Sequence, residues 1–143
     1  MADLHDLDRF IDAQAGAYET ALQEIRQGAK RSHWMWFIFP QLKGLGHSAM
    51  ANRYGISSLQ EAEAYLQHPI LGPRLRQCVG LVLQINGRPV EEIFGDPDDL
   101  KFRSCMTLFA NTAGDSAIFK DAMHKFFAGK PDRLTLDRLW PRQ

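Results

Sequence analysis

The chain has 143 residues, of which 45% are hydrophobic and 24% charged, and its formal net charge is zero. This size fits one domain around one core, so we expect a single domain over residues 1–143. A net charge of zero disfavours the extended basic footprint of a nucleic-acid-binding domain. The acidic N-terminus disfavours a signal peptide, and no apolar run approaches the ~20 residues of a membrane span. We therefore expect a cytoplasmic protein that does not enter the membrane.

Charge is segregated along the chain. Residues 1–24 contain six acidic residues and one arginine, whereas residues 25–60 contain five basic residues and no acidic one. The basic stretch is therefore the first place to look for an anion-binding site.

The first 28 residues predict two short helices. Apolar residues recur at helical spacing over 4–14 and again over 18–25, with a break near Gly16. Gly28 follows the second pattern, where it can provide a left-handed C-cap.

The next segment predicts a third helix with a sharp end. Ser32 is placed to cap a helix that runs to Phe39, because Pro40 disfavours helical backbone at the residue before it. A strand is the alternative, since short apolar runs do not distinguish the two. A further helix would start at His47 or Ser48.

The remainder of the chain predicts helices at regular intervals. Ser58 and Glu61 have the spacing of a capping box, and Ser116 is placed to cap the last long helix. Proline and glycine mark most of the other ends. We expect helices over 59–67, 74–85, 96–112 and 117–128, a short turn over 89–94, and a docked tail with Leu134, Leu136, Leu139 and Trp140. The sequence thus predicts an all-α, single multihelical domain of about seven to eight short and medium helices.

Residues 34–39 form a dense aromatic block. If they are helical, Trp34 and Phe37 share one face while Trp36 and Phe39 occupy others, so the helix is apolar all round. Such a helix is typical of the centre of a core. The alternative is that one tryptophan lines a pocket and stacks on a flat ligand.

The loop after the block combines two glycines with basic residues. Gly44 and Gly46 allow close backbone approach, the helix start at His47 or Ser48 favours negative charge, and Lys43 adds a full positive one. The spacing is neither a P-loop nor a dinucleotide fingerprint. The loop therefore indicates either an anion-binding site or a simple turn whose basic residues face the acidic first helix.

A polar stripe on the 96–112 helix indicates a second candidate surface. Ser104, Thr107 and Asn111 lie opposite its apolar face, where charged residues are more usual. Small polar side chains at this position suit partial burial against another polar surface or a ligand.

Two carboxylates open the same helix. Asp98 and Asp99 lie in the first turn, where they can simply offset the helix dipole, and Asp99 can pair with Arg103. Alternatively, one of them is a general base or ligand anchor with Lys101 nearby.

Other residues give few signs of chemistry. His33, beside the aromatic block, could carry a proton, as could His47. Cys78 and Cys105 lie in apolar helical patterns, so we expect reduced core residues. No spacing typical of a metal site or nucleophile elbow is present, and we expect no metal and no cofactor.

Three stretches of the chain resemble the domain-of-unknown-function family 1810. They are residues 30–48 (KRSHWMWFIFPQLKGLGHS), residues 65–75 (YLQHPILGPRL), and residues 93–95 (IFG) with Asp98, Lys101, Ser104 and residues 106–109 (MTLF). The resemblance covers nearly the whole chain and implies a small, all-helical bacterial protein, some of whose relatives carry a calpastatin-like label. It implies no particular activity. Its most typical positions fall on His33, Trp34, Trp36, Pro40, Gln41, Gly44, Gly46, Ser48, Asp98, Lys101, Ser104 and Thr107.

These observations favour a pocket for a small anionic ligand, nucleotide-like or phosphorylated. The expected ligand-binding residues are Trp34, Trp36, Gln41, Lys43, Gly44, Gly46, His47, Ser48, Lys101, Ser104 and Thr107. One alternative is a hydrolase or glycosidase acting on a nucleotide-derived molecule through Asp98, Asp99 or His33. Another is a protein-interaction module without a ligand. The oligomeric state is left open.

Overall fold

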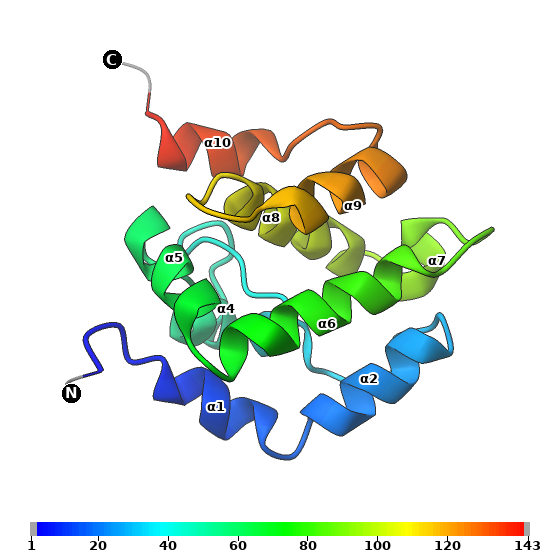
Figure 1. Cartoon of the computed structure of the whole chain (residues 1–143), viewed down its shortest axis with the longest axis horizontal. Helices are drawn as coiled ribbons and strands as arrows, with labels where there is room; N and C mark the ends of the chain where they lie inside the picture. The colour runs from blue at the N-terminus through cyan, green and yellow to red at the C-terminus, as the bar shows by residue number, and fades with distance from the viewer. Residues whose placement is uncertain (1–2, 142–143) are drawn as a thin grey trace.

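The computed structural model describes residues 3–141, and ten helices make up the fold over that range (Figure 1). They are α1 (Asp8–Gln14), α2 (Tyr18–Arg26), α3 (Met35–Ile38), α4 (Ala49–Tyr54), α5 (Leu59–Gln67), α6 (Leu71–Leu83), α7 (Val90–Phe94), α8 (Asp98–Ala110), α9 (Ala117–Phe127) and α10 (Arg133–Leu139). The described residues contain no strand, only an isolated bridge between Leu42 and Ile56. The all-α prediction is confirmed. The two additional helices are α7, expected as a turn, and α10, expected as a tail.

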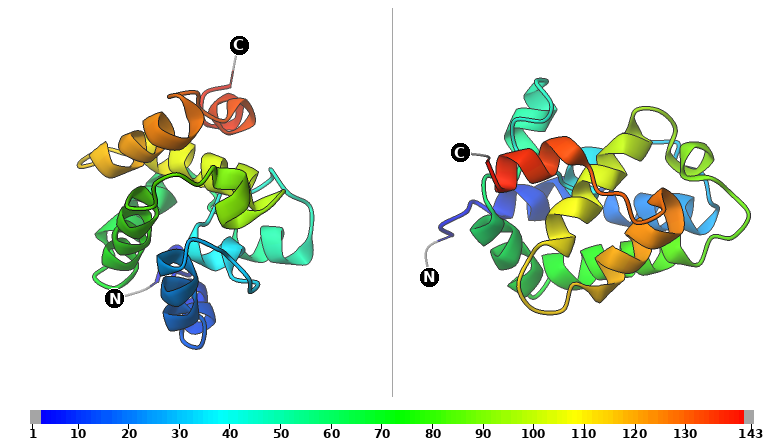
Figure 2. Two further views of the ribbon diagram at one scale, coloured as in Figure 1. Left: turned by 90° about the vertical axis from the view of Figure 1, so that its right-hand side faces the viewer. Right: turned by 90° about the horizontal axis from the view of Figure 1, so that it is seen from above.

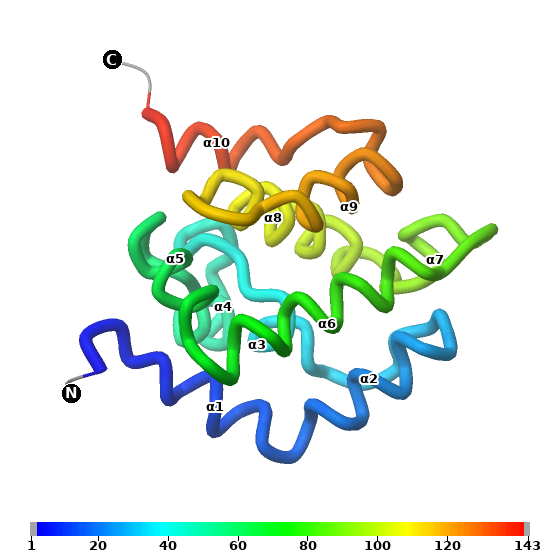
Figure 3. Tube along the Cα trace, viewed as in Figure 1, coloured from blue at the N-terminus to red at the C-terminus, as the bar shows by residue number. Residues whose placement is uncertain are grey.

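The helices are arranged around α6 and α8. α6 packs against α2, α5 and α9, while α8 packs against α5, α7, α9 and α10. α1 and α2 lie at one edge of the molecule and α9 and α10 at the opposite edge, as Figure 1 and the left view of Figure 2 show. The short helix α3 contacts α1 and α4 (Figure 3).

Aromatic side chains fill the core. The Phe102 ring stacks on Phe94 with 4.7 Å between centroids and meets Phe39 edge-on at 5.0 Å. Phe10 and Tyr65 form a similar edge-on pair at 5.1 Å. Each such pair contributes roughly 0.5–1.5 kcal/mol to the stability of the fold, in addition to the contribution from burial of the rings.

Both cysteines are buried free thiols, as expected. Burial raises the pKa of Cys78 to about 12 and that of Cys105 well above its usual range. Neither thiol is therefore ionised at neutral pH.

The prediction that Ser32 caps a helix reaching Phe39 is wrong. α3 begins only at Met35, has four residues, and has no side-chain cap. The Ser32 backbone N–H and hydroxyl both donate to the carboxylate of Glu24, at 2.9 and 2.6 Å. This tertiary acceptor replaces the local cap and leaves residues 31–34 irregular.

Other helix starts agree with the sequence signals to different degrees. Ser48 and Ser58 cap α4 and α5, each accepting a backbone N–H at 3.1 Å. Ser116 precedes α9 as expected, but its side chain forms no capping hydrogen bond. α6 begins at Leu71, three residues earlier than expected, which leaves Pro73 in its first turn, where proline is tolerated.

Candidate functional site

Glu24 organises the chain between α2 and α3. Its buried carboxylate accepts hydrogen bonds from the backbone N–H groups of Arg31 and Ser32, the Ser32 hydroxyl and the Trp34 indole. Burial alone would raise the pKa of Glu24, but these hydrogen bonds outweigh it and lower the pKa to about 2. The carboxylate is therefore charged at neutral pH and holds Trp34 in place.

The two tryptophans of the aromatic block have different environments. Trp34 is 1% exposed, and its only polar atom is taken up by Glu24 at 3.0 Å. Trp36 is half-buried and faces Lys101, whose Nζ lies 4.6 Å from the ring centroid. Trp36, rather than Trp34, is thus available to a ligand.

A charged group connects this block to α8. The carboxylate of Asp98 lies 2.7 Å from Lys30 Nζ and 3.2 Å from Lys101 Nζ. Lys30 Nζ also lies 5.2 Å from the centroid of the Trp34 ring. Because one carboxylate is shared by two lysines, Asp98 is committed to a structural ion pair.

The cleft beside Trp36 brings together several residues expected at a site. Trp36, Gln41 and Lys101 line it, with Met50 and Tyr54 of α4. Its volume is about 10 Å³, room for about one water molecule. Gly46 packs against two of the lining residues, since a Cβ there would lie 2.9 Å from the Ala51 Cβ and 3.6 Å from Gln41 Nε2.

Lys43 does not line this cleft but borders two open grooves. The loop is fixed at its start, where the Lys43 N–H donates to the Ile56 carbonyl at 2.8 Å. His47 and Ser48 are exposed at its end, and the Ser48 hydroxyl is used as the α4 cap. The expected composite site is therefore divided between the Trp36 cleft and the surroundings of Lys43.

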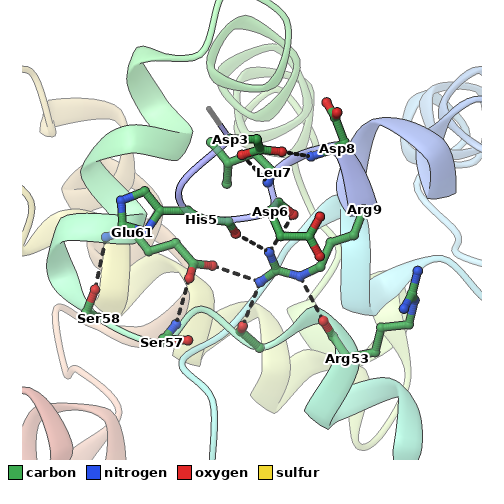
Figure 4. A network of polar contacts seen from close by, with 11 residues as sticks. Asp3, His5, Asp6, Leu7, Asp8, Arg9, Arg53, Ser57, Ser58 and Glu61 are labelled. Atoms are coloured by element: carbon green, nitrogen blue, oxygen red, sulfur yellow. Dashed lines mark hydrogen bonds and ion pairs between the residues drawn. The ribbon is translucent and has the colours of Figure 1, made fainter. Parts of the chain in front are cut away.

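The first groove, of about 700 Å³, has Arg9 among its lining residues and is called the Arg9 groove. The buried Arg9 guanidinium donates to four backbone carbonyls and to Glu61, at 2.6–3.0 Å (Figure 4). Its donors are thus already used to tie α1 to α4 and α5. The groove also contains carboxylates, those of Asp6 and Glu61, which oppose anion binding.

The second groove, the Lys43–Trp140 groove, has about 330 Å³ and lies between α5 and α10. It is lined by Leu42, Lys43, Ser57, Ser58, Leu59, Gln60, Arg138, Leu139 and Trp140. Within residues 3–141 no carboxylate lines it and no ion pair involves Lys43 or Arg138. Trp140 is 55% exposed. The groove therefore offers two positive charges and an accessible indole.

The polar stripe of α8 serves to dock α10. The Thr107 hydroxyl accepts a hydrogen bond from the Asp132 backbone N–H at 2.8 Å and donates one to the backbone carbonyl of Arg103 within its own helix. Ser104 is buried and donates only to the Leu100 carbonyl, one turn back. The expected pairing of Asp99 with Arg103 is wrong, because Arg103 donates to the carbonyls of Lys130 and Pro131 instead.

The carboxylate of Asp99 is buried at the start of α8. Its Oδ1 has no hydrogen-bond partner among the described residues. Burial raises the pKa of Asp99, and the nearby carboxylates of Asp96 and Glu91 raise it further. Neither Asp98 nor Asp99 lines the Trp36 cleft or either groove, and neither does the exposed His33.

Sequence reasoning missed Arg138 and Trp140. Both belong to the C-terminal segment, 95 positions after Lys43 in the case of Arg138, so no local spacing connects them to the loop. The sequence offered one signal for them: an arginine lies two positions before a tryptophan in the C-terminal segment, which we expected to pack against the domain.

Two further observations bear on the class of protein. Among residues 3–141, no three His, Cys, Asp or Glu side chains are grouped so that they could hold a metal ion. No helix of the described chain has the length and apolar character needed to cross a membrane.

The fold and these sites define a small all-helical domain with an open, cation-lined groove. The chain belongs to the family described as Protein of unknown function (DUF1810), whose model matches residues 4–139. This confirms the resemblance seen in the sequence. Among solved structures, the chain is similar to that of the conserved hypothetical protein Rv1873 from Mycobacterium tuberculosis, with 56% identity and a TM-score of 0.95. The similarity covers 96% of this chain and 98% of that chain. No curated protein matches the chain.

Proposed function

We propose that the protein binds a small anionic ligand with a flat aromatic part, such as a nucleotide, in the Lys43–Trp140 groove. The observation that carries this proposal is the joint presence of Lys43, Arg138 and an exposed Trp140 around one groove without a carboxylate among its described lining residues.

The charges around the groove favour an anion. Lys43 and Arg138 lack carboxylate partners within residues 3–141, so their positive charges are not compensated locally. α5 begins at the same groove with Leu59 and Gln60, and its dipole adds partial positive charge. Phosphate or carboxylate groups are the common biological anions that such donors bind.

The indole of Trp140 favours a flat group on the same ligand. An exposed tryptophan gives up little solvation when a base or other ring stacks on it, and such stacking contributes roughly 1–3 kcal/mol. Trp140 therefore takes the stacking role that the sequence suggested for Trp34 or Trp36. A volume of about 330 Å³ matches the lower end of small-molecule sites.

Binding of AMP, measured by isothermal titration calorimetry, tests the proposal. We expect Lys43→Ala and Arg138→Ala each to weaken binding by about tenfold, the usual effect of one charge-assisted hydrogen bond. Lys120→Ala, on the exposed surface of α9, is the matched control and should bind like the wild type. Equal affinities for all three variants would place the AMP site elsewhere.

The aromatic half of the proposal has its own readout. Trp140→Ala should weaken binding of AMP about tenfold, within the range of a lost stacking contact, while leaving the affinity for inorganic phosphate unchanged. A Trp140→Ala protein that binds AMP normally would remove the indole from the site.

A further inference from the structure

Arg138 is held in position by the loop beneath it. Its Nε donates to the Lys43 carbonyl at 3.1 Å. Its guanidinium also lies against Gly44, where a Cβ would come within 2.6 Å of the Arg138 Cζ. Gly44 has a φ of +98°, a conformation that side-chain-bearing residues rarely adopt. The absence of a side chain at position 44 thus provides the space in which the guanidinium rests.

This position decides which donors of Arg138 remain for a ligand. With Nε engaged by the backbone, neither Nη amino group donates a hydrogen bond within residues 3–141, and Nη2 is the atom that lies nearest to Gly44. The N–H groups of both Nη atoms therefore remain for a ligand. Two parallel N–H groups on a planar fork match two oxygens of one phosphate or carboxylate, which a lysine ammonium cannot imitate.

The number of charges at the groove suggests the charge of the anion. Lys43 and Arg138 together supply two positive charges, and no carboxylate among the described lining residues offsets them. A terminal phosphate monoester carries close to two negative charges above about pH 7, whereas a phosphodiester carries one. The monoester also presents three oxygens that can accept from both cations at once.

We propose that the Lys43–Trp140 groove selects terminal phosphate monoesters over phosphodiesters, with Arg138 as the two-pronged donor and Gly44 as the residue that positions it. This inference rests on the proposed function, because it specifies the anion bound in the same groove. A mononucleotide with a terminal phosphate is then the preferred ligand, and a nucleic-acid backbone or a cyclic nucleotide binds more weakly.

AMP and 3′,5′-cyclic AMP form a matched pair of probes for this selectivity. They share base and sugar and differ in whether the phosphate is a monoester or a diester. By calorimetry at about pH 8 we expect AMP to bind at least about tenfold more tightly. Equal affinities would overturn the selectivity while leaving the proposed function intact. Binding of neither nucleotide would overturn both.

The Arg138→Lys substitution distinguishes the effect of the two-pronged guanidinium from the effect of its positive charge. The variant keeps a positive charge at the groove, so the preference for AMP over cyclic AMP should persist, whereas both nucleotides should bind severalfold more weakly because an ammonium cannot replace the two-pronged donor. If Arg138→Lys binds AMP as tightly as the wild type, the guanidinium is not a two-pronged donor to the phosphate.

Gly44→Ala tests the positioning role. The added methyl displaces the guanidinium, so AMP binding should fall about tenfold in the wild-type background and not at all in the Arg138→Ala background. Gly114→Ala is the control for backbone strain, because Gly114 has a similar φ of +87° and no atom close to its Cβ position. Equal AMP affinities of the Gly44→Ala and Gly114→Ala proteins would exclude a positioning role for Gly44.

Discussion

A single buried carboxylate, that of Glu24, accepts four hydrogen bonds from the segment between α2 and α3. Hydrogen bonds to a charged acceptor are stronger than those between neutral groups, and here they fix the entry to the aromatic block. The same residue explains why Ser32 does not cap α3. Position 24 therefore controls local structure seven to ten residues away.

Glu24→Gln should lower the free energy of unfolding by roughly 2–3 kcal/mol at pH 7, because the amide cannot accept all four bonds. The pKa of Glu24 is lowered in the folded protein from 4.5 to about 2, so its stabilising effect is complete above pH 4.5 and is lost as pH falls towards 2. Urea denaturation at a series of pH values measures both effects. Glu19→Gln, on the exposed face of the same helix, is the control and should change little.

The contribution of Asp99 to stability should change with pH in the opposite direction to that of Glu24. Its pKa is raised from the ordinary value of 3.8, so the charged form is unfavourable in the folded state and stability decreases as pH rises from 3.8 through the raised pKa. Asp99→Asn removes the buried charge and should stabilise the protein by about 1 kcal/mol at pH 7, with no gain near pH 3.

The adjacent carboxylate provides the comparison for this prediction. Asp98→Asn breaks ion pairs with two lysines and should destabilise the protein at pH 7. Thermal unfolding measures both effects. If Asp99→Asn also destabilises the protein, the charged Asp99 carboxylate is stabilised in the folded state, and the prediction is wrong.

At the level of elements, α10 determines the geometry of the Lys43–Trp140 groove. This short helix is joined to α8 through Thr107 and to the loop through Arg138. Within this helix Thr135 is fully buried, whereas Leu134 is 64% exposed. We therefore expect the groove to lose its shape when α10 detaches from α8.

Thr107→Val should loosen α10 without disturbing the core. Valine has nearly the same shape but leaves the Asp132 N–H without its acceptor, at a cost of about 1–2 kcal/mol. Hydrogen exchange of a peptide spanning residues 130–140 should accelerate about tenfold. Ser104→Ala is the control from the same stripe, since Ser104 bonds only within its own helix. Equal acceleration in both proteins would argue against this docking role.

At the scale of the whole molecule, local signals predicted the fold well. Ser58, Gly28 and Pro40 mark helix ends through their own backbone chemistry, and the structure places ends there. Ser32 failed as a signal because a distant carboxylate took its donors, which no local pattern can reveal. α10 was missed as a helix because it depends on docking against α8 more than on its own sequence.

The candidate site was less predictable than the fold. Lys43 and Gly44 were identified by charge and by glycine spacing, and both contribute to the groove or to its support. Arg138 and Trp140 were not, since their approach to the loop follows from the packing of α10 on α8. Lys101 and Trp36 do meet, but in a cleft with room for about one water.

The three tryptophans lie at three different depths: Trp34 is 1% exposed, Trp36 half-buried and Trp140 55% exposed. Indole emission shifts to the red and becomes accessible to collisional quenchers as a ring meets water. The protein therefore contains its own optical probes. Acrylamide quenching of the red edge of the emission reports on Trp140, and the blue edge reports on Trp34. A titration can in this way be followed without any label, and loss of the groove can be distinguished from loss of the core.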